Sequence, residues 1–114
     1  MASVSEVTYG LCGSGLDRKL AGVLAALIVE GPGISCDIEK AAGLRQPEVS
    51  IGAKEGVARG WISAMKRPVP RGRPRMEYRL AVPVEEILGS LEAGAGHERK
   101  SVRKAAEHLQ ELAL

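Results

Sequence analysis

The 114-residue chain contains no phenylalanine, one tryptophan and two tyrosines. Its hydrophobic core must therefore be built from aliphatic side chains, and a hydrophobic content of 45% supplies enough of them. The 26% of charged residues is ordinary for a folded chain, and the length is that of one domain. Because so small a chain leaves much apolar surface uncovered, we expect an oligomer.

Cysteine is scarce, and long apolar runs are missing. Cys12 and Cys36 form no Cys-x-x-Cys pair, so the sequence predicts neither a disulfide framework nor a zinc site. No apolar run reaches the roughly 18 residues that a transmembrane helix needs. The first residues lack a charged stretch followed by a long apolar one, so we expect no signal peptide. These features predict a cytoplasmic protein with no membrane partner.

Residue patterns typical of catalysis are also missing. No pair of carboxylates, Ser/His set or phosphate-binding loop occurs at a recognisable spacing. His97 and His108 would lie roughly 16 Å apart along one helix, too far to share a metal ion. We therefore expect a protein that is not an enzyme, with no catalytic residue, no metal and no cofactor.

Positive charge is concentrated in one segment. Residues 66–79 hold six basic side chains and one acid, Glu77, which gives this segment a net charge of +5. The whole chain carries only +2, so the other 100 residues sum to −3. A basic patch on a mildly acidic body is typical of proteins that bind a polyanion.

Helices are predicted in the first half of the chain. A short one is expected over 3–12. Ser14, with Asp17 three residues later, is predicted to cap a second helix, which Gly31-Pro32-Gly33 ends. Apolar residues recur along that helix at the period of one face: Leu16, Leu20, Val23, Leu24, Leu27 and Ile28.

Two further helices are expected, one over 35–42 and one that starts near Arg45-Gln46-Pro47 and ends at Gly60. Ser35 is predicted to cap the first of them, and Gly43 fits the left-handed position after its end. Pro47 suits the first turn of the next helix, where its missing N–H has no partner to lose.

After Gly60 the pattern changes to that of strands. Residues 61–66 and 76–81 are predicted to pair, with a long proline- and arginine-rich loop that projects between them. Beyond Pro83, the sequence predicts a helical segment over 83–114. An apolar seam near its end is a predicted dimer contact, with packing on the chain's own first long helix as the alternative: Val102, Ala105, Ala106, Leu109 and Leu112.

The order helix, helix, glycine-containing turn, helix and basic hairpin resembles a winged helix-turn-helix. The match is carried by Ile38, Gly43, Leu44, Val49 and the segment 60–62. Gly43–Ser50 resembles the turn and recognition-helix start of archaeal and bacterial transcription regulators of the MarR, ArsR and TrmB type. Gly72–Pro74, followed by Tyr78–Leu80, resembles the wing of archaeal members. The resemblance covers roughly residues 14–82.

The resemblance implies an α+β, mainly α fold. A winged helix-turn-helix domain with a two-stranded β wing and an N-terminal extension would occupy 1–82, and C-terminal helices would occupy 83–114. The chain departs from the family pattern at Arg45, where Ser or Thr usually caps the recognition helix, and at Gly52 and Gly56 inside it. Each interior glycine costs a helix up to ~1 kcal/mol relative to alanine. Either the backbone approaches another element closely there, or the helix is soft until DNA holds it.

In this family the start of the third helix enters the major groove. The resemblance thus implies that Arg45 reads guanine, Gln46 adenine and Glu48 cytosine. Ile51 would contact a thymine methyl. Ser50 and Lys54 would reach phosphates, which fix register without reading sequence.

The predicted wing carries the remaining implied contacts. The stretch Pro70–Arg75 resembles the Arg-Gly-Arg-Pro core of an AT-hook, a minor-groove binder. Arg71, Arg73 and Arg75 are expected along or in the minor groove, with Lys66, Arg67 and Arg79 at the base of the wing on phosphates.

The sequence therefore predicts a sequence-specific regulator of transcription that binds double-stranded DNA as a homodimer, in the cytoplasm and associated with the nucleoid. Two alternatives remain. One is a winged-helix module that binds another protein. The other is an architectural chromatin protein that binds DNA without reading its sequence.

Overall fold

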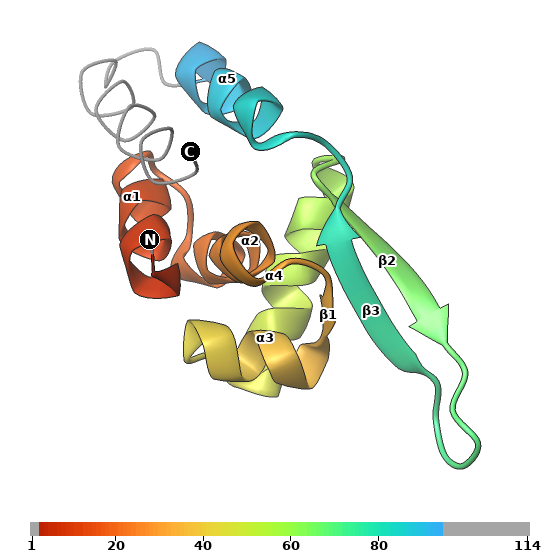
Figure 1. Cartoon of the computed structure of the whole chain (residues 1–114). Helices are drawn as coiled ribbons and strands as arrows, with labels where there is room; N and C mark the ends of the chain where they lie inside the picture. Colours follow the sequence, from red (N-terminus) through yellow and green to blue (C-terminus); the bar gives the residue numbers. More distant parts are fainter. Residues whose placement is uncertain (1–2, 95–114) are drawn as a thin grey trace.

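The computed structural model describes residues 3–94, which form five helices and a three-stranded antiparallel sheet (Figure 1). The fold is α+β and mainly helical. The elements follow one another as α1 (Val4–Gly13), α2 (Arg18–Glu30), β1 (Gly33–Ile34), α3 (Ser35–Ala42), α4 (Gln46–Ala58), β2 (Ile62–Arg67), β3 (Arg75–Leu80) and α5 (Val84–Gly94).

The first two helices begin at side-chain caps. Ser3 accepts a hydrogen bond from the Glu6 N–H at 3.1 Å, and the Glu6 carboxylate accepts one from the Ser3 N–H, so α1 starts with a capping box. Asp17 caps α2 by accepting from the Lys19 N–H at 3.1 Å. The prediction that Ser14 caps this helix was wrong. Ser14 instead lies at the C-terminal end of α1, where it is buried and its hydroxyl donates to the Gly10 carbonyl.

Helix α2 is the centre of the core. Every residue from Leu20 to Leu27 is buried, including the small residues that lie off the predicted apolar face. A helix buried on all sides must be surrounded by other elements, and α1, α3, α4 and β3 all contact it. The small residues bring these neighbours close, because a Cβ on Gly22 would lie 2.9 Å from the Leu44 side chain.

A tight turn joins α3 to α4. Gly43 is left-handed, with φ +66°, as the sequence predicted, and Leu44 is buried directly after it. The prediction that Ser35 caps α3 was wrong, because Ser35 is the first residue of the helix and Ile34 precedes it as the cap. The Asp37 carboxylate accepts from the Ile34 N–H at 3.3 Å and supplies the capping bond from inside the helix.

The sheet has the strand order β1-β3-β2. β2 and β3 pair from Ile62 opposite Leu80 to Arg67 opposite Arg75, one residue away from the predicted bounds of both strands. The expected two-stranded sheet is incomplete, because β1 adds a third strand beside β3, with Gly33 opposite Tyr78. Two residues are too few to show a strand pattern in sequence.

The β2–β3 hairpin extends away from the helices, and residues 68–74 form its far end (Figure 1). Ile62 at its base is buried, whereas the outer residues of β2 are exposed. On the other side of the fold, Ile87, Leu88 and Leu91 of α5 join the main cluster of buried apolar side chains. Among the described helices, none is both long and apolar enough to cross a bilayer.

Candidate nucleic-acid interface

Helix α4 presents the predicted base-reading residues on its outer side. Arg45, Gln46, Ile51 and Lys54 are exposed, and Ser50 is half-buried. Ile51 is 53% exposed. The opposite side of the helix is buried through Val49 and Ala53. The structure therefore brings this part of the predicted site together on one helix face.

Glu48 has a partner inside the chain. Its Oε1 accepts a hydrogen bond from the Arg45 N–H at 3.0 Å, which satisfies a backbone donor at the start of α4. This explains why the helix tolerates an arginine where a capping Ser or Thr is usual. The Glu48 carboxylate is thus committed to its own helix, and only its second oxygen is free of that bond.

The two glycines inside α4 mark close approaches to other elements. A Cβ on Gly52 would lie 2.5 Å from the Lys19 carbonyl oxygen of α2. A Cβ on Gly56 would clash with the Ile62 side chain at the base of β2. Of the two explanations offered for these glycines, close approach is therefore the one that the structure supports.

The hairpin divides its basic side chains between two faces. Alternate residues of a strand point to opposite faces, and Arg67 pairs directly with Arg75. Arg67, Arg75 and Arg79 consequently share one face with Glu77. Lys66 pairs with Met76 on the other face, which at the base of the hairpin holds the buried Ile62 and Tyr78. The sequence had grouped Lys66 with Arg67 and Arg79, and the strand register separates it from them.

We call Arg67, Arg75, Arg79 and Glu77 the arginine face. Glu77 Oε2 lies 3.1 Å from Arg67 Nε, and Glu77 Oε1 lies 2.9 Å from Arg79 Nη2. One carboxylate therefore contacts an arginine on each strand. In the sequence, Glu77 was notable only as one negative charge in a basic segment. Its position as the single acid among alternating bases on a strand was the signal that marked it.

The loop between the strands carries the other two arginines. Every residue from 70 to 75 is exposed, including Arg71 and Arg73, and Gly72 between them has φ +91°. A side chain at that φ is strained, so glycine fits this position. The loop that carries both arginines lies at the end of the hairpin farthest from the helices (Figure 1).

A second feature lies near the start of β2. The Arg59 guanidinium sits 5.0 Å from the centre of the Trp61 ring and 3.3 Å from the Glu55 carboxylate. Trp61 itself is buried, as expected of an aromatic residue that closes the small core. Arg59 is therefore held against its own fold, unlike the arginines of the loop.

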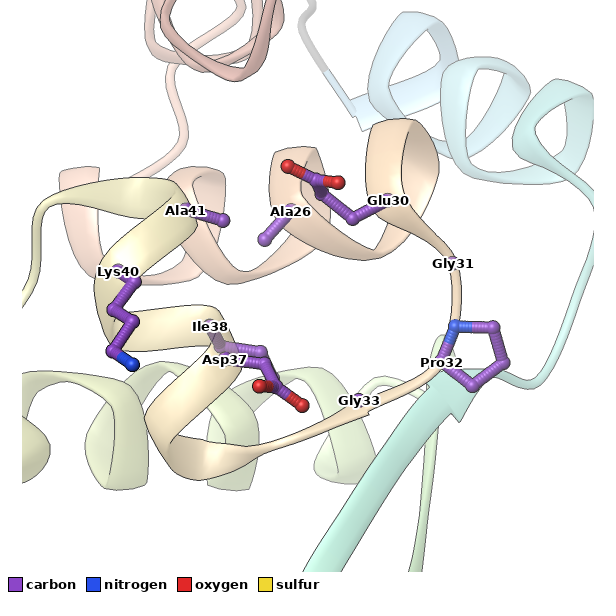
Figure 2. Close-up of a pocket in the computed structure, with 9 residues that line it drawn as sticks. All are labelled: Ala26, Glu30, Gly31, Pro32, Gly33, Asp37, Ile38, Lys40 and Ala41. Carbon is purple, nitrogen blue, oxygen red and sulfur yellow. The ribbon is translucent and has the colours of Figure 1, made fainter.

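A pocket of about 460 Å³ opens between the end of α2 and α3 (Figure 2). None of the predicted DNA-binding residues lines it, and its charged side chains are two acids and one base. Its walls are Ala26, Glu30, Gly31, Pro32, Gly33, Asp37, Ile38, Lys40 and Ala41.

The two cysteines differ in their surroundings. Burial, with a smaller contribution from the Asp17 carboxylate, raises the pKa of the Cys12 thiol. A raised pKa leaves less of the reactive thiolate at neutral pH. Cys36 is exposed near the start of α3. Within residues 3–94, no group of three or more potential metal ligands is gathered in one place.

The predicted dimer contact, at Val102, Ala105, Ala106, Leu109 and Leu112, lies outside the described residues. No protein-family model matches the chain, and no curated protein is significantly similar to it.

Proposed function

We propose that this protein is a winged helix-turn-helix regulator of transcription that binds double-stranded DNA as a homodimer. The observation that carries the proposal is the pairing of an exposed face on α4 with a projecting hairpin of net charge +5. A protein-docking domain would have little use for so much positive charge on one hairpin. No catalytic activity is part of the proposal.

In the proposed complex, the start of α4 lies in the major groove. Gln46 pairs with an adenine edge and Arg45 with a guanine, since both side chains are exposed at the helix start. Ile51 contacts a thymine methyl, and its exposure is consistent with that role. Ser50 and Lys54 reach phosphates. Glu48 serves mainly to cap the helix, because its carboxylate already accepts from the Arg45 N–H.

The hairpin contacts the DNA beside that groove. Arg71 and Arg73 enter the minor groove from the loop, where a narrow groove concentrates negative potential. Arg75, at the end of the loop, contacts the edge of the same groove and the adjacent DNA phosphates. Arg67 and Arg79 bind phosphates, and Lys66 meets the backbone from the other face of the hairpin.

One observation favours a second candidate, an architectural protein that binds DNA without reading sequence. Within Gln46–Ala58, α4 carries one base, Lys54, and two acids, Glu48 and Glu55. The positive charge thus belongs to the hairpin rather than to the helix proposed to read bases. Such a protein would depend on phosphate contacts alone.

Filter binding of the full chain to duplexes, at two or more salt concentrations, tests both candidates. We expect affinity that falls steeply with added salt, because each neutralised phosphate releases counterions. Absence of binding at low salt would contradict DNA binding of either kind. A set of random duplexes separates the two: a regulator prefers a subset by tenfold or more, whereas an architectural protein binds all of them with nearly equal affinity.

Gln46→Ala tests the proposed reading of bases. On a preferred duplex we expect a loss of ~1–3 kcal/mol that disappears when one base pair is changed. Lys54→Ala is the matched control from the same helix, and it should weaken binding to every duplex alike. A uniform loss with Gln46→Ala would remove this residue from base recognition.

A further inference from the structure

The arginine face sets three positive charges close together on one surface of the hairpin. Arg67 and Arg75 are direct cross-strand partners, at the last pair of the ladder before the loop. Like charges directly opposite each other destabilise a sheet. Arg79 follows on the same face of β3, two pleats along from Arg75. A surface of this kind is suited to bind anions that offset the repulsion.

Glu77 connects two of these arginines across the strands. The Glu77 side chain is only 12% exposed, and its carboxylate oxygens lie 3.1 Å from Arg67 Nε and 2.9 Å from Arg79 Nη2. The side chains of Arg67 and Arg79 are 66% and 49% exposed, so each presents about half or more of its surface to solvent. A guanidinium has five N–H donors, and the contact with Glu77 leaves several of them available.

These ion pairs contribute little to the stability of the fold. Both arginines are solvated, and ion pairs of solvated side chains are worth about 0–1 kcal/mol in most measurements, because solvent screens them and long side chains must be held still. Their larger consequence is geometric. A free arginine has many rotamers, and ordering one on binding costs affinity. Because Glu77 already orders both arginines in the unbound protein, less ordering is left to occur on binding.

We infer that the arginine face is a binding surface for the phosphodiester backbone, and that Glu77 is its positioning residue. The inference rests on the proposed DNA binding and deepens it. Glu77 holds Arg67 and Arg79 so that their remaining donors point away from the sheet toward two backbone phosphates. Arg75, opposite Arg67 at the loop end of the hairpin, extends this surface toward the minor groove.

A purely electrostatic account of Glu77 makes the opposite prediction. A carboxylate near DNA repels phosphates, so its removal should tighten binding by raising the net charge. Positioning predicts that its removal weakens binding in spite of the extra positive charge. The sign of the change therefore separates the two accounts.

The test is Glu77→Gln in the full chain, with Glu55→Gln as a matched control. Both changes remove one negative charge and one acid paired with arginine, but Glu55 pairs with Arg59 on α4 and lies outside the arginine face. On one duplex at about 0.1 M salt, we expect Glu77→Gln to bind roughly three- to tenfold more weakly than the unaltered chain. Glu55→Gln should bind as tightly or slightly more tightly.

The salt dependence gives a second measurement. If Arg67 and Arg79 each lose a phosphate contact, the slope of log affinity against log salt falls by about one to two for Glu77→Gln and stays constant for Glu55→Gln. Unchanged or tighter binding of Glu77→Gln, with an unchanged slope, overturns the inference while DNA binding stands. If the unaltered chain shows no salt-dependent binding, the proposed function itself fails.

Glu77→Asp covers the case in which the glutamine variant does not fold. It keeps the charge but is one methylene shorter, so it cannot span both arginines as Glu77 does. We expect an affinity between those of the unaltered chain and Glu77→Gln. An affinity and salt slope equal to those of the unaltered chain would overturn the positioning role, because charge alone would then suffice.

Discussion

At the scale of single residues, the glycines of α4 show how packing selects against the ordinary helix preference. Gly52 and Gly56 each lower the intrinsic helix propensity of α4. Gly52 lies against the backbone of α2 and Gly56 against Ile62, so no larger residue fits either place without movement. These close contacts determine the position of α4, the candidate base-reading helix, relative to α2 and to the base of the hairpin.

Gly52→Ala should destabilise the protein by ~1–3 kcal/mol, as overpacked cores do. The new Cβ would meet the Lys19 carbonyl at 2.5 Å, and a backbone oxygen cannot rotate out of the way as a side chain does. The better helix propensity of alanine recovers only part of this cost. The measurement is the denaturation midpoint in urea.

Gly89→Ala on α5 is the matched control. Nothing lies within 4 Å of a Cβ at Gly89, so the same change should stabilise the chain by ~0.4–1 kcal/mol. If Gly52→Ala were as stable as Gly89→Ala, the close approach of α4 to α2 would be wrong.

At the scale of elements, the hairpin was the best predicted part of the candidate site. Its strands were placed to within one residue, because alternation of apolar and charged residues has the period of a strand. The same alternation assigns each basic residue to a face once the register is known. Alternation alone puts Lys66 and Arg67 on opposite faces, whereas the register, which depends on which residues pair, puts Arg75 and Arg79 on the face of Arg67.

Arg71→Ala with Arg73→Ala tests the role of the loop. We expect weaker binding to all duplexes and a salt slope lowered by about one to two per chain, since the loop then loses its groove and phosphate contacts. Arg18→Ala with Lys40→Ala is a control that removes the same charge from exposed positions on α2 and α3.

The control pair should leave the salt slope constant, because neither residue belongs to the proposed interface. Equal slopes for the loop variant and the unaltered chain would remove the loop from the contact surface. Equal losses in both double variants would mean that net charge alone decides affinity.

At the scale of the whole molecule, the proposal requires two copies of the chain. A two-fold dimer matches two DNA half-sites separated by about one helical turn. The apolar seam predicted at 102–112 is the expected contact between the two copies, since an unpaired seam would leave large aliphatic side chains in water.

Sedimentation equilibrium of the full chain should give twice the chain mass of 12.0 kDa. Leu109→Asp with Leu112→Asp should shift the mass toward one chain, because a carboxylate buried in an apolar contact is strongly unfavourable. A monomeric mass for the unaltered chain at concentrations that saturate DNA would contradict the dimer.

The sequence alone determined the helices, the two strands of the hairpin, the turn at Gly43 and the concentration of charge in that hairpin. These features depend on local periodicity, on the conformational freedom of glycine and on charge, all of which are written along the chain. Two helix caps were misplaced. Asp17 rather than Ser14 caps α2, and α3 is preceded by Ile34, whose N–H is capped by the Asp37 side chain rather than by Ser35.

Only the tertiary structure decided what depends on residues far apart in the chain. It showed why α4 contains two glycines, which face of the hairpin each basic residue occupies, and that β1 extends the sheet. It also placed Glu77 between Arg67 and Arg79. Each of these follows from the packing of separate elements, and no local pattern encodes which elements will meet.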